Sequence, residues 1–175
     1  MLFRSVTAQS AAVILAGAGI EQRVRNVSMV LVEEDVPRPD SKFANEKLSP
    51  VLTVYRARDF DHAMDLVAAV LAVNGSGHSM SIHSIDDDRI LRLGLEMPVC
   101  RVIVNQAHCF ATGGSFDNGL PFSLSMGCGS WGGNSISDNM NYRHYLNTTR
   151  IARTIAPREP TLDDIFGDYW ERYGR

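Results

Sequence analysis

Cysteine is scarce in this sequence, and its spacing excludes two kinds of scaffold. The 175 residues contain three cysteines, Cys100, Cys109 and Cys128. An odd number at long spacing argues against a disulfide framework, and no Cys-x-x-Cys pair offers a zinc ligand set, so no metal site is expected. Unpaired thiols fit a reducing compartment, and we therefore expect a cytoplasmic protein.

Excess positive charge and long apolar runs are also missing. The 17 basic and 20 acidic residues leave a formal net charge of −3. This balance gives no electrostatic footprint for nucleic acid or an anionic membrane surface, so neither is expected as a partner. The apolar run at residues 11–20 is far shorter than the roughly 20 residues of a membrane span. We interpret it as the end of a helix packed in a core.

The remaining composition, 45% apolar and 21% charged residues, indicates one soluble globular domain. Hydrophobic periods typical of strands and helices alternate along it. The expected strands are residues 27–33, 52–56, 78–84 and 101–105. The expected helices are residues 59–73 and 86–97, with Asp59 and Asp86 as their N-terminal caps. This order predicts an α/β fold with a parallel sheet. Ligands of such folds bind beyond the carboxyl ends of the strands, here from Gln106 onward.

Glycine is concentrated in one segment of the chain. Seven of the 14 glycines lie between Gly113 and Gly133. Glycine lets the backbone turn with positive φ or approach a ligand closely. Large apolar residues such as Phe122 and Trp131 are interleaved with the glycines. Linkers rarely contain such residues, so we expect an ordered loop rather than a flexible connection.

Two cysteines invite a catalytic interpretation, and one histidine does so more strongly. Cys128 stands between two glycines, and Cys109 follows His108. If the strand before them continues, His108 and Cys109 point to opposite faces and cannot act as a pair. Free cysteine is mostly a small buried hydrophobe, so a structural role is favoured for all three. His78 follows a Gly-Ser-Gly turn at a strand entrance, where an imidazole could take part in proton transfer.

The C-terminal residues have a pattern of their own. Residues 150–156 alternate like an exposed strand, and residues 161–164 form a Thr-Leu-Asp-Asp capping box before an aromatic helix. An alternating strand near a terminus is an edge that has to be covered. The tail either packs on its own domain or binds another subunit, and we favour the second, a homo-oligomer.

Three motifs resemble those of the CoA-acylating aldehyde dehydrogenases. They are FANEKLSPVL at residues 43–52, GHS at residues 77–79 and GCGSWGGNSIS at residues 127–137. The resemblance extends from about Thr7 to the end and is closest to the acylating sulfoacetaldehyde dehydrogenases and the aldehyde half of the bifunctional aldehyde-alcohol dehydrogenases. It implies the parallel three-layer sheet of the aldehyde dehydrogenase catalytic domain, with a C-terminal oligomerisation tail.

The resemblance also implies roles for individual residues. Glu46 corresponds to the glutamate that holds the nicotinamide ribose of NAD or NADP, and His78 to a histidine proposed to assist the chemistry of CoA. The segment lining the substrate and CoA side would consist of Asn105, Gly127, Cys128, Gly129 and Trp131. The family reaction converts a small aldehyde, CoA and NAD(P)⁺ to acyl-CoA and NAD(P)H. Sulfoacetaldehyde is one candidate aldehyde, and NAD and NADP both remain open.

Family members are much longer, and none of the three cysteines stands at the position of their nucleophile. We therefore expect a C-terminal part of the enzyme, inactive by itself, with exposed apolar surface that favours aggregation or partial folding. Residues 6–147 would belong to the catalytic domain and residues 148–175 to the oligomerisation strand and helix. Residues 1–5 match a translated sequencing adapter and are expected to be a non-native start.

Two alternatives remain open beside the enzyme part. The first is a noncatalytic module that docks through its tail onto a full-length subunit. The second is an independent Cys/His hydrolase that uses Cys128 as its nucleophile.

Overall fold

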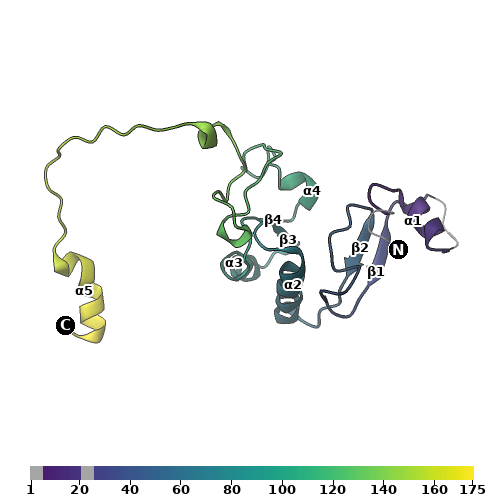
Figure 1. Ribbon diagram of the computed structural model, residues 1–175. Helices are drawn as coiled ribbons and strands as arrows, with labels where there is room; N and C mark the ends of the chain where they lie inside the picture. Colours follow the sequence, from purple (N-terminus) through teal and green to yellow (C-terminus); the bar gives the residue numbers. More distant parts are fainter. Residues whose placement is uncertain (1–5, 21–25) are drawn as a thin grey trace. The chain divides into compact units, whose positions relative to one another are not determined.

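The computed structural model describes residues 6–20 and 26–175, so the expected non-native start at residues 1–5 lies outside the described residues. The chain divides into two compact units, residues 1–144 and 145–175. Each unit is described by itself (Figure 1). Unit 1 contains all three motifs of the family resemblance, at residues 43–52, 77–79 and 127–137.

The helices and strands follow the order that the hydrophobic periods predict, with shorter strands. In chain order they are α1 (Ala11–Gly17), β1 (Val30–Glu33), β2 (Val51–Val54), α2 (Phe60–Asn74), β3 (Met80–Ile82), α3 (Asp87–Glu96), β4 (Val102–Val104), α4 (His108–Ala111), the 3₁₀ turns η2 (Ser130–Gly132) and η3 (Tyr142–Tyr145), and α5 (Leu162–Tyr173). The predicted caps of α2 and α3 are confirmed, because Asp59 accepts from the backbone N–H of His62 and Asp86 from that of Arg89.

Strands β1 and β2 form a parallel pair whose two faces differ. Val30 pairs with Val51, and Leu31 with Leu52. Side chains alternate along a strand, so the valine face turns to α1, where it lines an apolar cavity of about 220 Å³. Leu31 and Leu52 on the other face are 64% and 51% exposed. One face of this pair is therefore packed and the other faces solvent.

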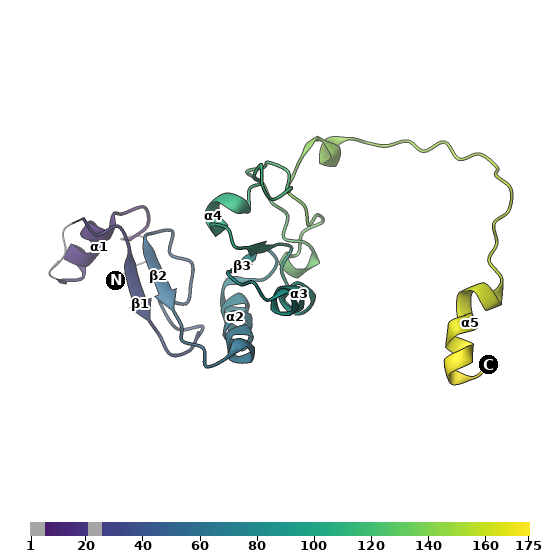
Figure 2. The same cartoon turned by 180° about the vertical axis from the view of Figure 1, so that it is seen from behind.

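The main core lies where α2 and α3 meet the second strand pair. Strands β3 and β4 are parallel, with Met80 opposite Val102 and Ile82 opposite Val104, and α3 connects them. The buried centre of this core consists of Met64, Leu93, Met97 and Val99. Figures 1 and 2, which view the chain from opposite sides, both show α2 and α3 beside these strands. This βαβ unit fixes the positions of the loops at both strand ends.

The α/β class and the parallel pairing are confirmed, but the strands are arranged differently from the expectation. In the part of the chain that the structure describes, they form two separate pairs, β1 with β2 and β3 with β4. The sequence predicted one sheet that included β2 and β3. Hydrophobic periodicity identifies strands but carries no information on which strand pairs with which.

Unit 2 confirms one local prediction and corrects another. The capping box is present, since the Thr161 hydroxyl accepts from the Asp164 N–H while the Asp164 carboxylate accepts from the Thr161 N–H. The expected strand at residues 150–156 is wrong: these residues are exposed and have no regular structure. A strand needs a neighbour to pair with, and alternation of side chains alone does not supply one.

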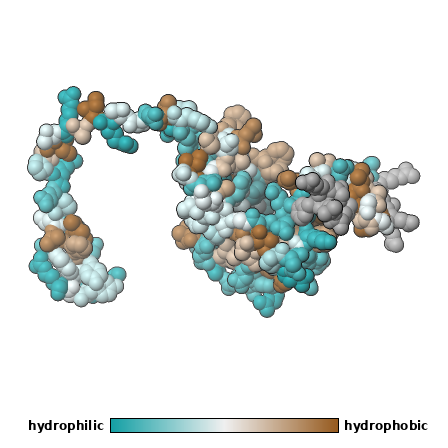
Figure 3. Space-filling view, in the orientation of Figure 1, coloured by the Kyte–Doolittle hydropathy of each residue, from teal (hydrophilic) through white to brown (hydrophobic). Residues whose placement is uncertain are grey.

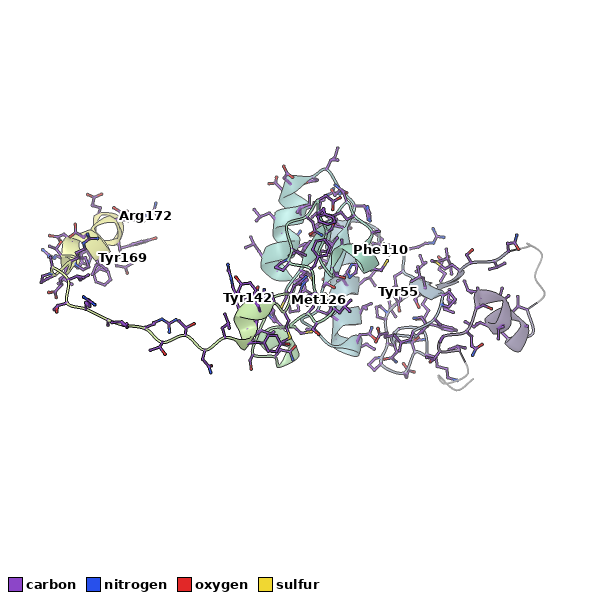
Figure 4. All side chains as sticks on the ribbon, turned by 90° about the horizontal axis from the view of Figure 1, so that it is seen from above. Tyr55, Phe110, Met126, Tyr142, Tyr169 and Arg172 are labelled. Atoms are coloured by element: carbon purple, nitrogen blue, oxygen red, sulfur yellow. The ribbon has the colours of Figure 1, made fainter. Side chains whose placement is uncertain are left out.

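Hydrophobic side chains reach the surface of both units, as Figure 3 shows for one face. In unit 2, Tyr169 (labelled in Figure 4) is 59% exposed and Ile165 54% exposed. Among the described residues, no helix is both long and apolar enough to cross a bilayer.

The open face of β1 and β2 should make the chain bind hydrophobic dyes and self-associate. We predict that the double variant Leu31→Glu, Leu52→Lys lowers 8-anilinonaphthalene sulfonate fluorescence and self-association in sedimentation velocity, because it places opposite charges at paired positions of this face. The control Ile85→Lys changes a 99% exposed side chain outside the strands and should alter neither signal. Equal dye binding by the double variant and the wild type would contradict the assignment.

Candidate functional site

Two residues that the sequence singled out, Glu46 and His78, line the same cavity in unit 1. The cavity has a volume of about 540 Å³. Its walls come from residues 43–47, the end of β2, the last turn of α2 and the segment entering β3, and include Lys47, Tyr55 and Ser79. Both side chains are exposed. A carboxylate and an imidazole from distant parts of the sequence therefore face one space.

The loop that bears Glu46 is held by side chains on both sides. Asn74, at the end of α2, accepts from the Glu46 N–H at 2.9 Å and donates to the Ala44 carbonyl at 2.7 Å. The Lys47 ammonium donates to the carbonyls of Phe43 and Asn45 at 2.5 and 2.9 Å. Burial lowers the pKa of Lys47, and the charge of Glu34 opposes that shift. No motif or hydrophobic period in the sequence indicates that Asn74 and Lys47 bind the backbone of this loop.

Tyr55, in the cavity wall, is hydrogen-bonded to the partly buried carboxylate of Glu34. Its hydroxyl donates to one oxygen of the Glu34 carboxylate at 3.0 Å, and the Ser41 hydroxyl donates to the other at 2.5 Å. Burial, the hydrogen bond to Glu34 and the charge of Glu34 raise the pKa of Tyr55 to about 12. Tyr55 therefore remains a neutral phenol at physiological pH and acts as a hydrogen-bond donor.

Ser79 lies between two imidazoles. The Ser79 Oγ is 2.5 Å from His78 Nδ1 and 2.9 Å from His108 Nε2. His108 is half-buried, and its pKa is lowered by burial and then by the charge of His78. The strand does not continue to these residues: β4 ends at Val104, and His108, at the start of α4, contacts Ser79.

Arg101, at the entrance of β4, holds the loops behind the cavity together. It is 5% exposed. Its guanidinium donates to the Asn139 side-chain oxygen at 2.6 Å and to the carbonyls of His78, Gly127 and Ser137 at 3.1, 2.9 and 3.2 Å. A buried cation is costly unless its donors are satisfied, and here every nitrogen has a partner. The sequence does not predict this role, because the hydrophobic pattern of residues 101–105 indicates only a strand.

Asn139 extends the contacts of Arg101 to the glycine-rich segment. It is 2% exposed, and its amide nitrogen donates to the carbonyls of Thr112 and Pro121 at 3.0 and 2.8 Å. Residues 112–139 are therefore tied to the strand pair through one arginine and one asparagine. This confirms the expectation that the glycine-rich segment is ordered.

The glycines at positions 77 and 127 allow close backbone packing. A Cβ atom at Gly77, which has φ of +108°, would lie 2.2 Å from the Cys128 carbonyl oxygen. A Cβ at Gly127 would lie 2.2 Å from the Ile136 carbonyl oxygen. The GCG motif thus packs directly on the turn that precedes His78. Close contact within the protein, rather than with a ligand, accounts for these two glycines.

The other residues of the predicted substrate segment lie apart from the Glu46 and His78 cavity. Gly127 lines a second cavity of about 590 Å³ together with Asn134. Trp131 lies in η2 and is 54% exposed. The Asn105 amide accepts from the Ser84 N–H at 2.9 Å and donates to the Ser84 carbonyl at 2.7 Å. These two bonds prolong the pairing of β3 and β4, which is a structural role for Asn105.

The three cysteines show no arrangement typical of a nucleophile. Burial raises the pKa of Cys100, and this effect outweighs the opposing charge of Arg101. In residues 6–20 and 26–175, no cysteine sulfur is hydrogen-bonded to an imidazole, and no group of three His, Cys, Asp or Glu side chains could hold a metal ion. The backbone N–H of Cys128 and Gly129, next to the sulfur, donate to Asn134 Oδ1 and the Ile136 carbonyl.

Comparison with solved structures identifies the fold to which this site belongs. The acetylating aldehyde dehydrogenase of Geobacillus thermoglucosidasius superimposes with a TM-score of 0.80 at 31% identity, over 89% of this chain and 34% of that one. The fold is therefore that of part of an acylating aldehyde dehydrogenase.

Sequence comparison agrees with the structural one. The acylating sulfoacetaldehyde dehydrogenase of Cupriavidus necator is 58% identical over 98% of this chain. The bifunctional aldehyde-alcohol dehydrogenase of Escherichia coli K12 is 35% identical over 79% of the chain and 16% of its own length. No family model matches. The chain is homologous to one part of the acylating aldehyde dehydrogenases, and it spans about a third of the length of its sulfoacetaldehyde dehydrogenase relative, 35%.

The contacts of Arg101 lead to a stability prediction. Arg101→Leu leaves three carbonyls and the Asn139 amide without their donor, and we expect it to lower the free energy of unfolding of unit 1 by about 3 kcal/mol. The control Arg56→Leu removes an exposed ion pair with Glu33 and should leave the free energy of unfolding nearly unchanged. Urea unfolding followed by Trp131 fluorescence, in a Trp170→Phe background, measures both. Equal losses would contradict the role of Arg101.

Proposed function

We propose that the chain is the C-terminal part of a NAD(P)-dependent, CoA-acylating aldehyde dehydrogenase. The observation that carries the proposal is the single cavity shared by Glu46 and His78. Within the family these positions serve different partners, the nicotinamide ribose and CoA. Their convergence on one space is what an enzyme needs if the cofactor and the acyl acceptor act on the same carbon atom.

Glu46 fits the role of holding the nicotinamide ribose. Its carboxylate is exposed to the cavity, while its backbone is fixed by Asn74 at 2.9 Å. Two carboxylate oxygens can accept hydrogen bonds from both ribose hydroxyls, which would orient the nicotinamide ring. When bound, NAD(P)⁺ supplies the acceptor for a hydride. Either NAD or NADP can serve, because these hydroxyls are common to both.

His78 fits the role of a base for the CoA thiol. Its side chain is exposed and lines the cavity, and Nδ1 is occupied by Ser79. Nε2 is then the nitrogen available to a ligand. Removal of the thiol proton by an imidazole produces a thiolate, which is the reactive form of the acyl acceptor. The segment formed by Gly127, Cys128, Gly129 and Trp131 would border the CoA side, behind His78.

The proposed substrate is a small aldehyde, with sulfoacetaldehyde as the first candidate. Support comes from the acylating sulfoacetaldehyde dehydrogenase of Cupriavidus necator, which is 58% identical. The nucleophilic cysteine would be supplied by a segment outside these 175 residues. The raised pKa of Cys100 and the absence of a described imidazole partner for any of the cysteines support this assignment. The chain alone would then be inactive.

We further propose that unit 2 contacts another subunit of a cytoplasmic homo-oligomer. Helix α5 has rows of stacked aromatic rings, Phe166 with Trp170 and Tyr169 with Tyr173. Phe166 and Tyr173 are 43% and 67% exposed. Apolar helix faces of this kind are usually buried against another surface, and a second copy of the enzyme is the partner that we favour over docking by a noncatalytic module.

A chimaera tests the proposed function. This chain replaces the corresponding segment of the Cupriavidus necator relative, and NAD(P)H formation is followed with sulfoacetaldehyde and CoA. We expect turnover by the chimaera and none by the 175-residue chain. Glu46→Gln should lower kcat/KM for NAD(P)⁺ roughly 10- to 100-fold, because a charged acceptor of hydrogen bonds is lost.

The matched control is Glu96→Gln, which changes an exposed carboxylate paired with Arg92 on α3. It should alter kcat/KM by less than about twofold. Full activity of the Glu46→Gln chimaera would refute the ribose role. Turnover by the chain alone, abolished by changing one of its thiols to serine, would contradict the assignment of the nucleophile to another segment.

A further inference from the structure

Ser79 and His108 are two residues next to the proposed base to which no role has been assigned. The Ser79 hydroxyl contacts His78 Nδ1 at 2.5 Å and His108 Nε2 at 2.9 Å. Ser79 lines the cavity with His78, whereas His108 comes from α4 behind it. The three side chains form a continuous row from the cavity into the protein.

A serine hydroxyl has one proton, so it can donate to only one of the two rings. If it donates to His108 Nε2, its oxygen is left to accept a hydrogen bond from His78 Nδ1–H. If it donates to His78 Nδ1, then Nε2 of His78 must bear the proton of the neutral ring. The ring to which the Ser79 hydroxyl donates therefore decides which nitrogen of His78 can act as a base.

Burial favours the first direction. His78 is exposed and His108 half-buried, and burial lowers the pKa of His108. The half-buried His108 ring depends on a donor from within the protein, whereas the exposed His78 can also bond to water, so the Ser79 hydroxyl donates to His108 Nε2. The Ser79 oxygen then accepts from His78 Nδ1–H. In the neutral His78 ring, Nε2 is therefore the nitrogen without a proton.

The other groups around His78 are compatible with this direction. Glu46, Lys47 and the neutral phenol of Tyr55 line the same cavity. Arg101 donates to the main-chain carbonyl of His78 rather than to its ring. Among the described residues, none is hydrogen-bonded to Nε2 of His78, so this nitrogen is open to a ligand.

We propose that Ser79 and His108 are positioning residues that fix the tautomer of His78, with the proton on Nδ1 and Nε2 facing the cavity. The inference rests on the proposed function for the identity of the ligand, a thiol. When His78 acts, the S–H bond of the thiol breaks and an N–H bond forms at Nε2, which leaves a thiolate and an imidazolium. The imidazolium is stabilised through Nδ1–H and Ser79.

The tautomer can be read directly from the ring ¹⁵N shifts of the 175-residue chain labelled with ¹⁵N-histidine. Magic-angle-spinning NMR is suitable because it does not require a monomeric sample. In the neutral His78 ring, we expect Nδ1 to be protonated and Nε2 unprotonated. In Ser79→Ala and His108→Phe, the His78 proton should shift to Nε2, the site that neutral imidazole prefers in water.

Ser81→Ala is the matched control, because it removes a hydroxyl from β3 that has no imidazole partner among the described residues, and it should leave the His78 tautomer unchanged. His62 and His144, whose Nδ1 atoms accept from Arg58 and Asn141, should keep their shifts in every variant. A wild-type His78 protonated on Nε2 overturns the inference, whatever the variants do. So does an unchanged tautomer in Ser79→Ala. Neither result depends on NAD(P), CoA or aldehyde, so the proposed function can stand or fail separately.

Discussion

The buried guanidinium of Arg101 is the interaction on which the site depends. It connects the carbonyl of His78 with those of Gly127 and Ser137 and with Asn139. Through Asn139 the same network reaches residues 112 and 121. Large apolar side chains of the glycine-rich segment, such as Phe122 and Trp131, are exposed. Buried charged and amide hydrogen bonds therefore hold the segment to the strand pair. The location of His78 is set by the same contacts.

Local signals in the sequence predicted the helices and their ends well. Asp59, Asp86 and Thr161 each cap the helix that follows, because a short polar side chain before an apolar period satisfies the first N–H groups wherever the helix lies. The pairing of strands and the fate of residues 150–156 were not predictable in this way. Both depend on what lies beside a strand, and that is decided by contacts between distant residues.

The candidate site shows the same division. Glu46 and His78 were found through the motifs that contain them, and the structure places both at one cavity. The residues that hold them, Asn74, Ser79 and Arg101, had no expected role of their own, although Ser79 belongs to the GHS motif. The hydrogen bonds of Asn74 to Glu46, of Ser79 to His108 and of Arg101 to His78 join positions 23 or more residues apart. The sign that the sequence offered was an arginine at the start of an apolar strand.

The central claim is that Glu46 and His78 form opposite sides of one cofactor and acyl-transfer site. A crystal structure of the active chimaera with bound NAD⁺ and CoA tests it most directly. The account predicts the Glu46 carboxylate within hydrogen-bond distance of both nicotinamide ribose hydroxyls, and His78 Nε2 on the side of the thiol. A cofactor bound elsewhere, with the Glu46 carboxylate in solvent, would contradict it.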